Sequence, residues 1–305
     1  MVHHSTLADK LSRLDIPDCI YNWLVEFLRE RRHKTKFQGR LSELASISAS
    51  IVQGSGVGPA DFIVNSSDLQ PVHSENLIVK FADDSYLLVG SKMRDTVQEE
   101  LDSVKRWAEV NNLQLNQGKS REMIIHRRAH VEPPALLSGV TRVTTMKILG
   151  VTIRSDIRAT SHVDEILASC SGSLHELRTL RSQGLSSEAL QVVTDATTVS
   201  RLMYAVPAWW GYTSADDRSR IEKFLIRTRR MGYLRMDSPS ADEMARSADD
   251  RLLSAVIWND THVLRRLFPP TIKRHYSLRP RRHDFILPAK DDKNFIPRAL
   301  YRNIT

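Results

Sequence analysis

The sequence predicts an α+β first half and a mainly helical second half. Leu77–Ala82 and Tyr86–Gly90 are short apolar runs on either side of Asp83-Asp84, a pattern that is typical of a β-hairpin. After about Thr160, apolar residues recur instead at the spacing of an amphipathic helix. A chain of 305 residues is long enough to form two domains with a sizeable core.

The first 60 residues alternate between helix and strand signals. Two amphipathic helices are expected, over Met1–Leu14 and after Pro17, each with an apolar face. The basic stretch Arg29–Lys36 comes next, and the alternating run Ser46–Val52 predicts a strand. A glycine-rich loop, Gln53–Pro59, then leads into another apolar segment.

One helix and two strands are expected after the hairpin. Asp95 and Gln98 have the spacing of a capping box, which predicts a helix start. That helix is expected to end at Asn111, because asparagine tolerates the left-handed conformation found at helix ends. Glu122–His126 and Lys147–Ile153 predict the two strands.

The second half is expected to contain three long helices, at His162–Leu180, Ser187–Ala205 and Ala215–Met231. From Phe268 onward the chain is rich in proline and basic residues. We expect that tail to be irregular or loosely packed.

Composition narrows the class of protein. The net charge of +8 and the pI of about 9.6 favour a polyanionic partner. Cys19 and Cys170 are the two cysteines; both are expected on buried helix faces, and they provide neither a disulfide framework nor a zinc cluster. No apolar run approaches the ~20 residues that cross a bilayer, and the N-terminus lacks the apolar core of a secretory signal. We therefore expect an intracellular protein of the nucleus or cytoplasm without a membrane partner; the oligomeric state stays unknown.

Asp83 and Asp84 are the first candidates for chemistry. Carboxylates beside an apolar core are costly to bury unless a positive charge compensates them. Magnesium would do so, and in two-metal sites ions ~3.5–4 Å apart stabilise the attacking and leaving oxygens of phosphoryl transfer. The alternative is a solvated turn, because Asp-Asp is common in turns.

Four blocks give this pair a context. The chain carries, in this order, QGSGVGP (Gln53–Pro59), FADDSYLLV (Phe81–Val89), the block Trp107–Ser120 and ILGV (Ile148–Val151). They resemble motifs B, C, D and E of the reverse transcriptases of non-LTR (LINE-type) retrotransposons, jockey-like elements in particular. The order and the approximate spacing also match that family, and the resemblance covers most of the chain.

The resemblance implies an α+β polymerase palm with partial fingers over residues 1–153. A helical thumb would follow over 154–240, and a basic C-terminal region over 241–305. The implied activity is RNA-directed DNA polymerisation, a nucleotidyl transfer with two Mg²⁺ ions. Its partners would be an RNA template, a DNA primer and deoxynucleoside triphosphates.

Residue roles follow by the same resemblance. Asp83 would be a metal ligand, Asp84 would bind metal less directly, and Lys119 would lie near the triphosphate as a charge clamp or acid. The backbone of Leu149 and Gly150 would contact the primer. The loop that contacts nucleotide and template would use Gln53, Gly54, Ser55, Gly58 and Pro59. The plain alternatives are an ordinary turn for the glycine-rich loop, an exposed surface lysine for Lys119 and an ordinary core strand for Leu149 and Gly150.

A basic stripe is expected on the helix Ala215–Met231. Its cations fall on one side, opposite a face of mainly apolar residues, which suits contact with a phosphate backbone and resembles the family's thumb. A solvated charged face is the alternative. The stripe consists of Arg220, Lys223, Arg227 and Arg230, and the opposite face of Ile221, Phe224, Leu225 and Thr228.

One motif departs from the family. Motif A would supply another essential aspartate, and Met1–Leu7 matches only the tail of that motif. We therefore expect an N-terminally truncated fragment that is inactive as a polymerase. The alternative is a remnant that binds nucleic acid without catalysis.

Overall fold

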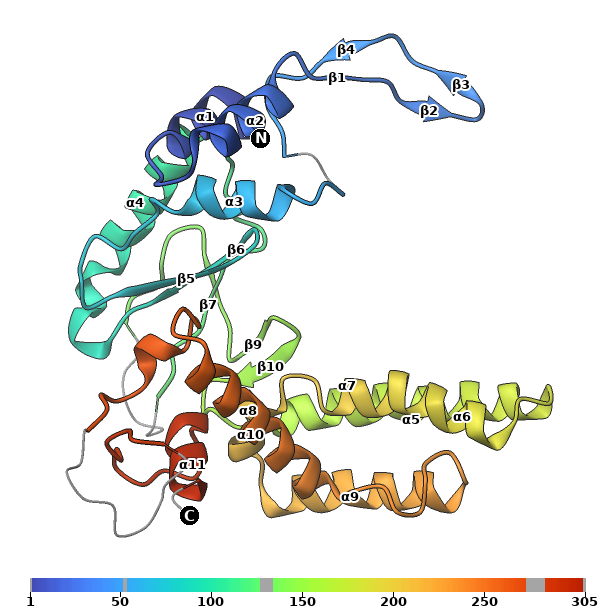
Figure 1. Cartoon of the computed structure of the whole chain (residues 1–305). Helices are drawn as coiled ribbons and strands as arrows, with labels where there is room; N and C mark the ends of the chain where they lie inside the picture. The colour runs from blue at the N-terminus through green and yellow to red at the C-terminus, as the bar shows by residue number, and fades with distance from the viewer. Residues whose placement is uncertain (1, 52–53, 127–133, 273–282, 304–305) are drawn as a thin grey trace. The chain divides into compact units, whose positions relative to one another are not determined.

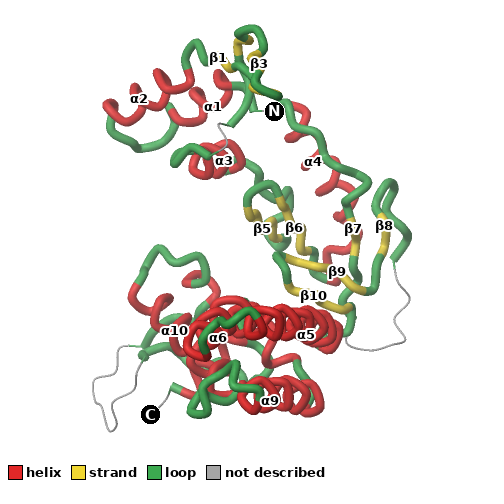
Figure 2. The backbone as a smooth tube through the Cα atoms, turned by 90° about the vertical axis from the view of Figure 1, so that its right-hand side faces the viewer, coloured by secondary structure: helices red, strands yellow, loops and turns green. Residues whose placement is uncertain are grey.

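The computed structural model describes residues 2–51, 54–126, 134–272 and 283–303. The chain divides into two compact units (Figure 1). Unit 1 comprises Met1–Ser120 with Pro134–Thr141, and unit 2 comprises Arg121–Pro133 with Arg142–Thr305. Helices and short strands are both present (Figure 2), so the α+β expectation is confirmed. Among the described residues, every strand belongs to a two-stranded sheet.

Four helices form the frame of unit 1. They are α1 (His4–Leu11), α2 (Asp18–Leu28), α3 (Gly58–Ser66) and α4 (Val97–Val110). The apolar faces of α1 and α2 meet in a small core, as their periodicity predicts. The buried members of that core are Val2, Leu7, Leu11 and Leu28.

Two expectations for these helices are wrong. Asp95 does not cap α4; it lies in the 3₁₀ helix η1 (Ser91–Thr96), and the N-cap residue Thr96 makes no side-chain hydrogen bond. Cys19 is exposed at the start of α2, whereas Cys170 is buried as expected. Helical spacing places Cys19 on a face but does not determine whether another element covers that face.

The strands of unit 1 form hairpins. The arm consists of β1 (Arg32–His33) paired with β4 (Ala45–Ser46), and β2 (Lys36–Phe37) paired with β3 (Arg40–Leu41). The strand expected over Ser46–Val52 is wrong for most of its described residues: Ser46 ends β4, and after it Ala49 forms an isolated bridge with His3. The expected hairpin around the aspartates is confirmed as β5 (Leu77–Phe81) and β6 (Asp84–Leu88).

Short strands come next in the chain. β7 (Arg121–Glu122) is shorter than the strand expected there, and β8 spans Thr141–Arg142. The single strand expected over Lys147–Ile153 is wrong: this stretch lies in an antiparallel hairpin of two strands, β9 (Thr145–Ile148) and β10 (Val151–Arg154), with a turn between them.

Helices make up most of the rest. The three expected helices are confirmed, with a π-helical turn, η2 (Asp195–Val199), inside the second. The helical elements are α5 (Thr160–Ser182), α6 (Ser187–Thr194), α7 (Ser200–Leu202), α8 (Val206–Trp209), η3 (Trp210–Tyr212), α9 (Ala215–Arg230), α10 (Ala241–Trp258), η4 (Arg265–Leu267) and α11 (Phe295–Arg302). None of the described helices is long and apolar enough to span a bilayer.

Unit 2 has two apolar cores. The larger one joins the buried faces of α5, α9 and the start of α10, with Trp209 and Trp210 inside it. The smaller one joins α10 and α11 and includes Phe268 and Phe285, whose ring centroids are 5.1 Å apart. The described part of the C-terminal region is therefore better packed than its proline and arginine content predicts.

Candidate functional site

The β5–β6 turn holds the two aspartates in the open. Phe81 pairs with Asp84, so Ala82 and Asp83 form a two-residue turn. Ala82 has a φ of 49°, in the left-handed region that costs a residue with a Cβ about 1–2 kcal/mol. Both carboxylates are exposed, so the expectation that they lie buried beside a core is wrong. The Tyr86 hydroxyl donates to Asp84 Oδ2 over 3.4 Å.

Lys80 anchors the strand that leads to this turn. Its Nζ donates to the backbone carbonyls of Ser66, at 2.6 Å, and Leu69, at 2.9 Å. Burial lowers the pKa of the Lys80 ammonium, although Asp68 opposes that shift. β5 is therefore fixed to the C-terminal end of α3, the helix that follows the glycine-rich loop. Sequence reasoning missed Lys80; its signal is a lysine inside an otherwise apolar strand.

A second lysine joins three helices of unit 1. Lys10 of α1 donates to Asp68 Oδ1 at 2.8 Å and to Asn111 Oδ1 at 2.7 Å, and its Nζ is 2.5 Å from the carbonyl oxygen of Asn65. Trp107 Nε1 also donates to Asp68 Oδ1, at 2.9 Å. Burial of Asp68 opposes its ionisation, but the hydrogen bonds from Lys10 and Trp107 outweigh it and lower the pKa of Asp68. Asp68, which follows α3, and Trp107 of α4 therefore meet Lys10 of α1 at one polar contact point.

The glycine-rich loop is partly described. Gln53 lies outside the described residues. Gly54 has a φ of 80°, and no atom lies within 4 Å of where a Cβ would stand, so its backbone conformation and not crowding favours glycine. Ser55 Oγ accepts the N–H of Gly58 at 3.0 Å, and Pro59 stands at the start of α3. The loop therefore leads directly into that helix.

Lys119 lies in the turn that follows α4. Its backbone N–H donates to Asn116 Oδ1 at 3.1 Å, while its side chain is exposed. Within the described ranges it forms no salt bridge. That position suits an available cation, and it equally suits an ordinary surface lysine.

The Leu149-Gly150 turn of unit 2 joins β9 to β10. Leu149 has a φ of 47° and Gly150 of 86°, the two positive values of a type I′ hairpin turn. The carbonyl oxygen of Leu149 accepts the Tyr204 hydroxyl at 3.1 Å. This carbonyl, which we predicted to contact a primer, thus has a hydrogen-bond partner within the chain. Sequence analysis did not identify Tyr204 as that partner.

The basic stripe of α9 is divided. The opposite face is buried as expected, at Ile221, Phe224, Leu225 and Thr228. Arg220 is already paired, with Asp164 at 2.5 Å and Asp217 at 3.5 Å. Lys223, Arg227 and Arg230 are exposed, and no acidic partner among the described residues pairs with them. Three of the four predicted cations are therefore available to a polyanion.

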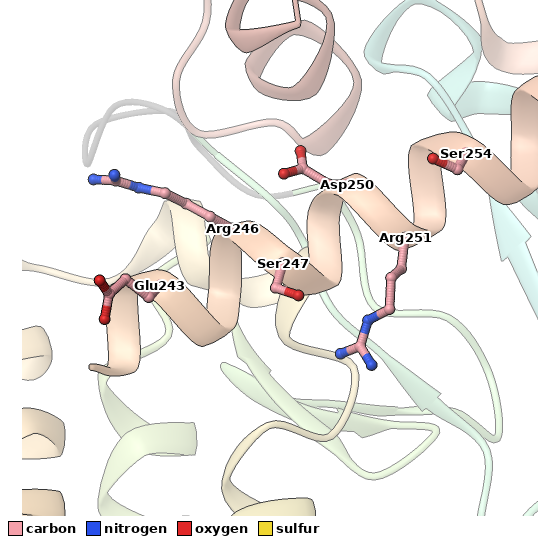
Figure 3. A pocket seen from close by; sticks show the side chains of 6 residues that line it. All are labelled: Glu243, Arg246, Ser247, Asp250, Arg251 and Ser254. Atoms are coloured by element: carbon pink, nitrogen blue, oxygen red, sulfur yellow. The ribbon is translucent and has the colours of Figure 1, made fainter. Parts of the chain in front are cut away.

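A shallow hollow on α10 holds none of the predicted site residues. Figure 3 shows that its lining side chains come from this one helix. Two of its charges are already paired, Arg246 with Asp242 and Asp250 with Arg302. The lining residues are Glu243, Arg246, Ser247, Asp250, Arg251 and Ser254.

Comparison with known proteins gives the site its context. Residues 1–153 match the family described as reverse transcriptase (RNA-dependent DNA polymerase). The RNA-directed DNA polymerase from mobile element jockey of Drosophila melanogaster is 30% identical over 179 residues, 54% of this chain and 19% of that protein. The probable RNA-directed DNA polymerases from transposons X-element and BS of the same fly are 25% and 23% identical, over 54% and 95% of this chain. The chain spans about a fifth to a third of the length of these relatives.

Proposed function

The chain belongs to the reverse transcriptase family, and we propose that it forms part of an RNA-directed DNA polymerase of a jockey-like mobile element. In that reaction the primer 3′-hydroxyl attacks the α-phosphorus of a deoxynucleoside triphosphate chosen by the RNA template, and pyrophosphate leaves. Under this proposal residues 1–153 are the palm with partial fingers, 154–240 the thumb and 241–305 a basic C-terminal region. The observation that carries the proposal is the exposed Asp83-Asp84 turn inside the family match.

The donor set at the turn fits magnesium. Mg²⁺ prefers carboxylate oxygens and is commonly held by one or two carboxylates, with water and substrate phosphates as its other ligands. Asp83 and Asp84 are adjacent, exposed carboxylates and would hold it. Bound magnesium supplies Lewis-acid stabilisation to the phosphate oxygens that gain charge. The described residues form no cluster of three or more His, Cys, Asp or Glu side chains, so a two-ion site needs a further donor.

The other candidate residues would position the substrates. The glycine-rich loop, from Gln53 to Pro59, would contact nucleotide and template, with Gly54 permitting a conformation that a larger residue resists. The exposed Lys119 ammonium would neutralise triphosphate charge or donate a proton to pyrophosphate. The Leu149-Gly150 turn would contact the primer through its remaining backbone groups, since Tyr204 occupies the Leu149 carbonyl.

Metal binding tests the role of the aspartates without requiring activity. Mn²⁺ can replace Mg²⁺, and electron paramagnetic resonance counts the bound ions. Asp83→Asn with Asp84→Asn should weaken Mn²⁺ binding at least tenfold. Asp95→Asn, which removes another exposed carboxylate from unit 1, is the control and should leave binding unchanged. Equal binding by both variants would refute the assignment.

Primer extension tests the reaction. The expectation that this 305-residue chain is inactive alone stays a prediction, to be measured with an RNA template, DNA primer, triphosphates and magnesium. Incorporation that is lost in Asp83→Ala would establish polymerase activity and refute the inactive reading.

A second candidate function is nucleic-acid binding without catalysis. Lys223, Arg227 and Arg230 of α9, which pair with no acidic side chain in the part of the chain that the structure describes, favour it, because cations in a row on a helix suit a phosphate backbone. It predicts salt-sensitive binding of primer–template that Asp83→Ala does not change.

A further inference from the structure

The arm of unit 1, residues 29–46, is a ribbon without a core of its own. Every residue from 32 to 46 is exposed, and Figure 1 shows the ribbon extending away from α1 and α2. It ends in a two-residue turn, where Gln38 has a φ of 47° and Gly39 of 80°. Both values are positive, as in the type I′ turns that close tight hairpins. The turn and ladder define the ribbon locally while leaving both its faces uncovered.

The arm carries much of the chain's charge. Six cations and two carboxylates give it a net charge of +4, half of the chain's +8. Arg29 pairs with Glu26, and Arg31 lies over the Phe27 ring. The other cations of the arm, Arg32, Lys34, Lys36 and Arg40, form no salt bridge within the described residues.

Strand alternation brings three of these cations to one face. Arg32 is opposite Ser46 and Lys36 is opposite Leu41, so one extra residue lies in the second strand, where Glu43 and Leu44 oppose Lys34. The bulge leaves the alternation of the first strand intact. Arg32, Lys34 and Lys36 therefore project from the same face, about 6.6 Å apart along the strand.

That row matches a repeating anion better than a single small one. A nucleic-acid backbone repeats its phosphate charge at every nucleotide, and lysine and arginine are its usual side-chain partners. The face has no Asn or Gln that could read base edges; its other members, from the second strand, are Leu41 and Ser46, with Glu43 and Leu44 opposite Lys34. Phe37, which could stack on an unpaired base, lies on the opposite face with Arg40.

We propose that the arm is a nucleic-acid contact separate from the Asp83 turn, in which Arg32, Lys34 and Lys36 bind successive phosphates of a duplex. The choice of a nucleic acid among polyanions rests on the proposed function. The binding is independent of base sequence, because the contacts are to the backbone.

The salt dependence of binding tests the proposal. The full chain is titrated into a fluorescein-labelled RNA–DNA hybrid of about 20 base pairs, and fluorescence anisotropy measures Kd at salt concentrations between about 50 and 200 mM. Each lost phosphate contact lowers the slope of log K against log salt by about 0.9. Arg32→Gln, Lys34→Gln and Lys36→Gln together should therefore lower it by about 2.7 and weaken binding at least tenfold at 50 mM salt.

Two matched variants control for charge and folding. Lys92→Gln, Arg94→Gln and Arg106→Gln remove three exposed cations from the same unit and should leave the slope within 0.5 of the wild type. Arg32→Lys, Lys34→Arg and Lys36→Arg keep the charges and should keep the slope. An unchanged slope in the arm variant, or an equal loss in the Lys92 control, overturns the proposal.

Two further outcomes separate this proposal from its rivals. If polyglutamate displaces the labelled duplex from the chain as well as unlabelled duplex does, the partner of the arm is an acidic polypeptide and the proposal is overturned. A chain that fails to extend primers yet shows the arm-dependent slope would contradict polymerase activity and still support the arm contact.

Discussion

The Tyr204 hydroxyl donates a hydrogen bond to the carbonyl oxygen of Leu149, 55 residues earlier, at 3.1 Å. The same ring limits the space at the next residue, since a Cβ on Gly150 would lie 3.2 Å from Tyr204 Cε1. Leu149 and Gly150 both have positive φ. One aromatic side chain therefore adds both a hydrogen bond and a close packing contact to the β9–β10 turn.

Gly150→Ala should destabilise the chain by about 1–3 kcal/mol, because alanine at positive φ is strained and its methyl meets Tyr204. Tyr204→Phe should cost less, about 0.5–1.5 kcal/mol, because it removes one hydrogen bond from a half-exposed ring. Urea unfolding measures both. The reverse order of effects would contradict this account of the turn.

Ala82→Gly should stabilise the chain slightly. Glycine relieves the strain of the left-handed conformation, which is worth about 1–2 kcal/mol. The greater conformational freedom of glycine in the unfolded chain offsets about 0.5–1 kcal/mol of that gain. Ala168→Gly, in the exposed middle of α5, is the matched control and should destabilise by about 1 kcal/mol. The prediction fails if both changes have the same sign in urea unfolding.

Glu100 should make stability depend on acid pH. Its carboxylate accepts the N–H groups of Val72 and His73, each at 2.9 Å, and Asn76 Nδ2 at 2.8 Å. Burial opposes ionisation, but these hydrogen bonds outweigh it and lower the pKa of Glu100 below its ordinary 4.5. A lowered folded-state pKa stabilises above about pH 4.5, and this contribution is lost as pH falls through the folded value.

Glu100→Gln should therefore make the free energy of unfolding depend less on pH between about 5 and 3. It should also lower that free energy at pH 7 by about 1–3 kcal/mol, because the amide cannot satisfy all three donors. Glu109→Gln, on the exposed side of α4, should do neither. Urea midpoints measured across this pH range test both variants; an acid limb that persists in Glu100→Gln would exclude the mechanism.

The two cysteines should react at very different rates. Cys19 is exposed, whereas Cys170 is buried and its Sγ lies 3.7 Å from the Thr198 carbonyl oxygen. Burial raises the pKa of the Cys170 thiol to about 11, and the thiolate is the reactive form. At pH 8 a thiol reagent should label one site per folded chain and two after unfolding. Cys19→Ser should remove the fast reaction; fast labelling that persists would show that Cys170 is accessible.

Arg220 and Arg227 of α9 should affect nucleic-acid binding differently. Arg220 is held by Asp164 and Asp217, while Arg227 is exposed and has no acidic partner in the described part of the chain. Arg227→Gln should lower the salt slope of primer–template binding by about 0.9, and Arg220→Gln by much less. Equal effects would mean that the Arg220 ion pairs open on binding.

Local patterns predicted the parts of this fold that depend on neighbours in sequence. The β5–β6 hairpin followed from alternation around Asp83 and Asp84, and the buried face of α9 followed from helical spacing. The same spacing gave α2 one apolar stripe, yet Ile20 and Trp23 of that stripe are about half exposed. Periodicity determines which residues share a face, and packing determines whether anything covers it.

Contacts between residues far apart in sequence escaped prediction. Asp164 is 56 residues from Arg220, and Lys10 is 101 residues from Asn111, so no local pattern joins either pair. The sequence alone determined the family, through four short blocks in order, and it placed Asp83 and Asp84 at the junction of a hairpin. Only the tertiary structure decided which cations already have partners and which remain available to a phosphate, because pairing depends on distances that folding sets.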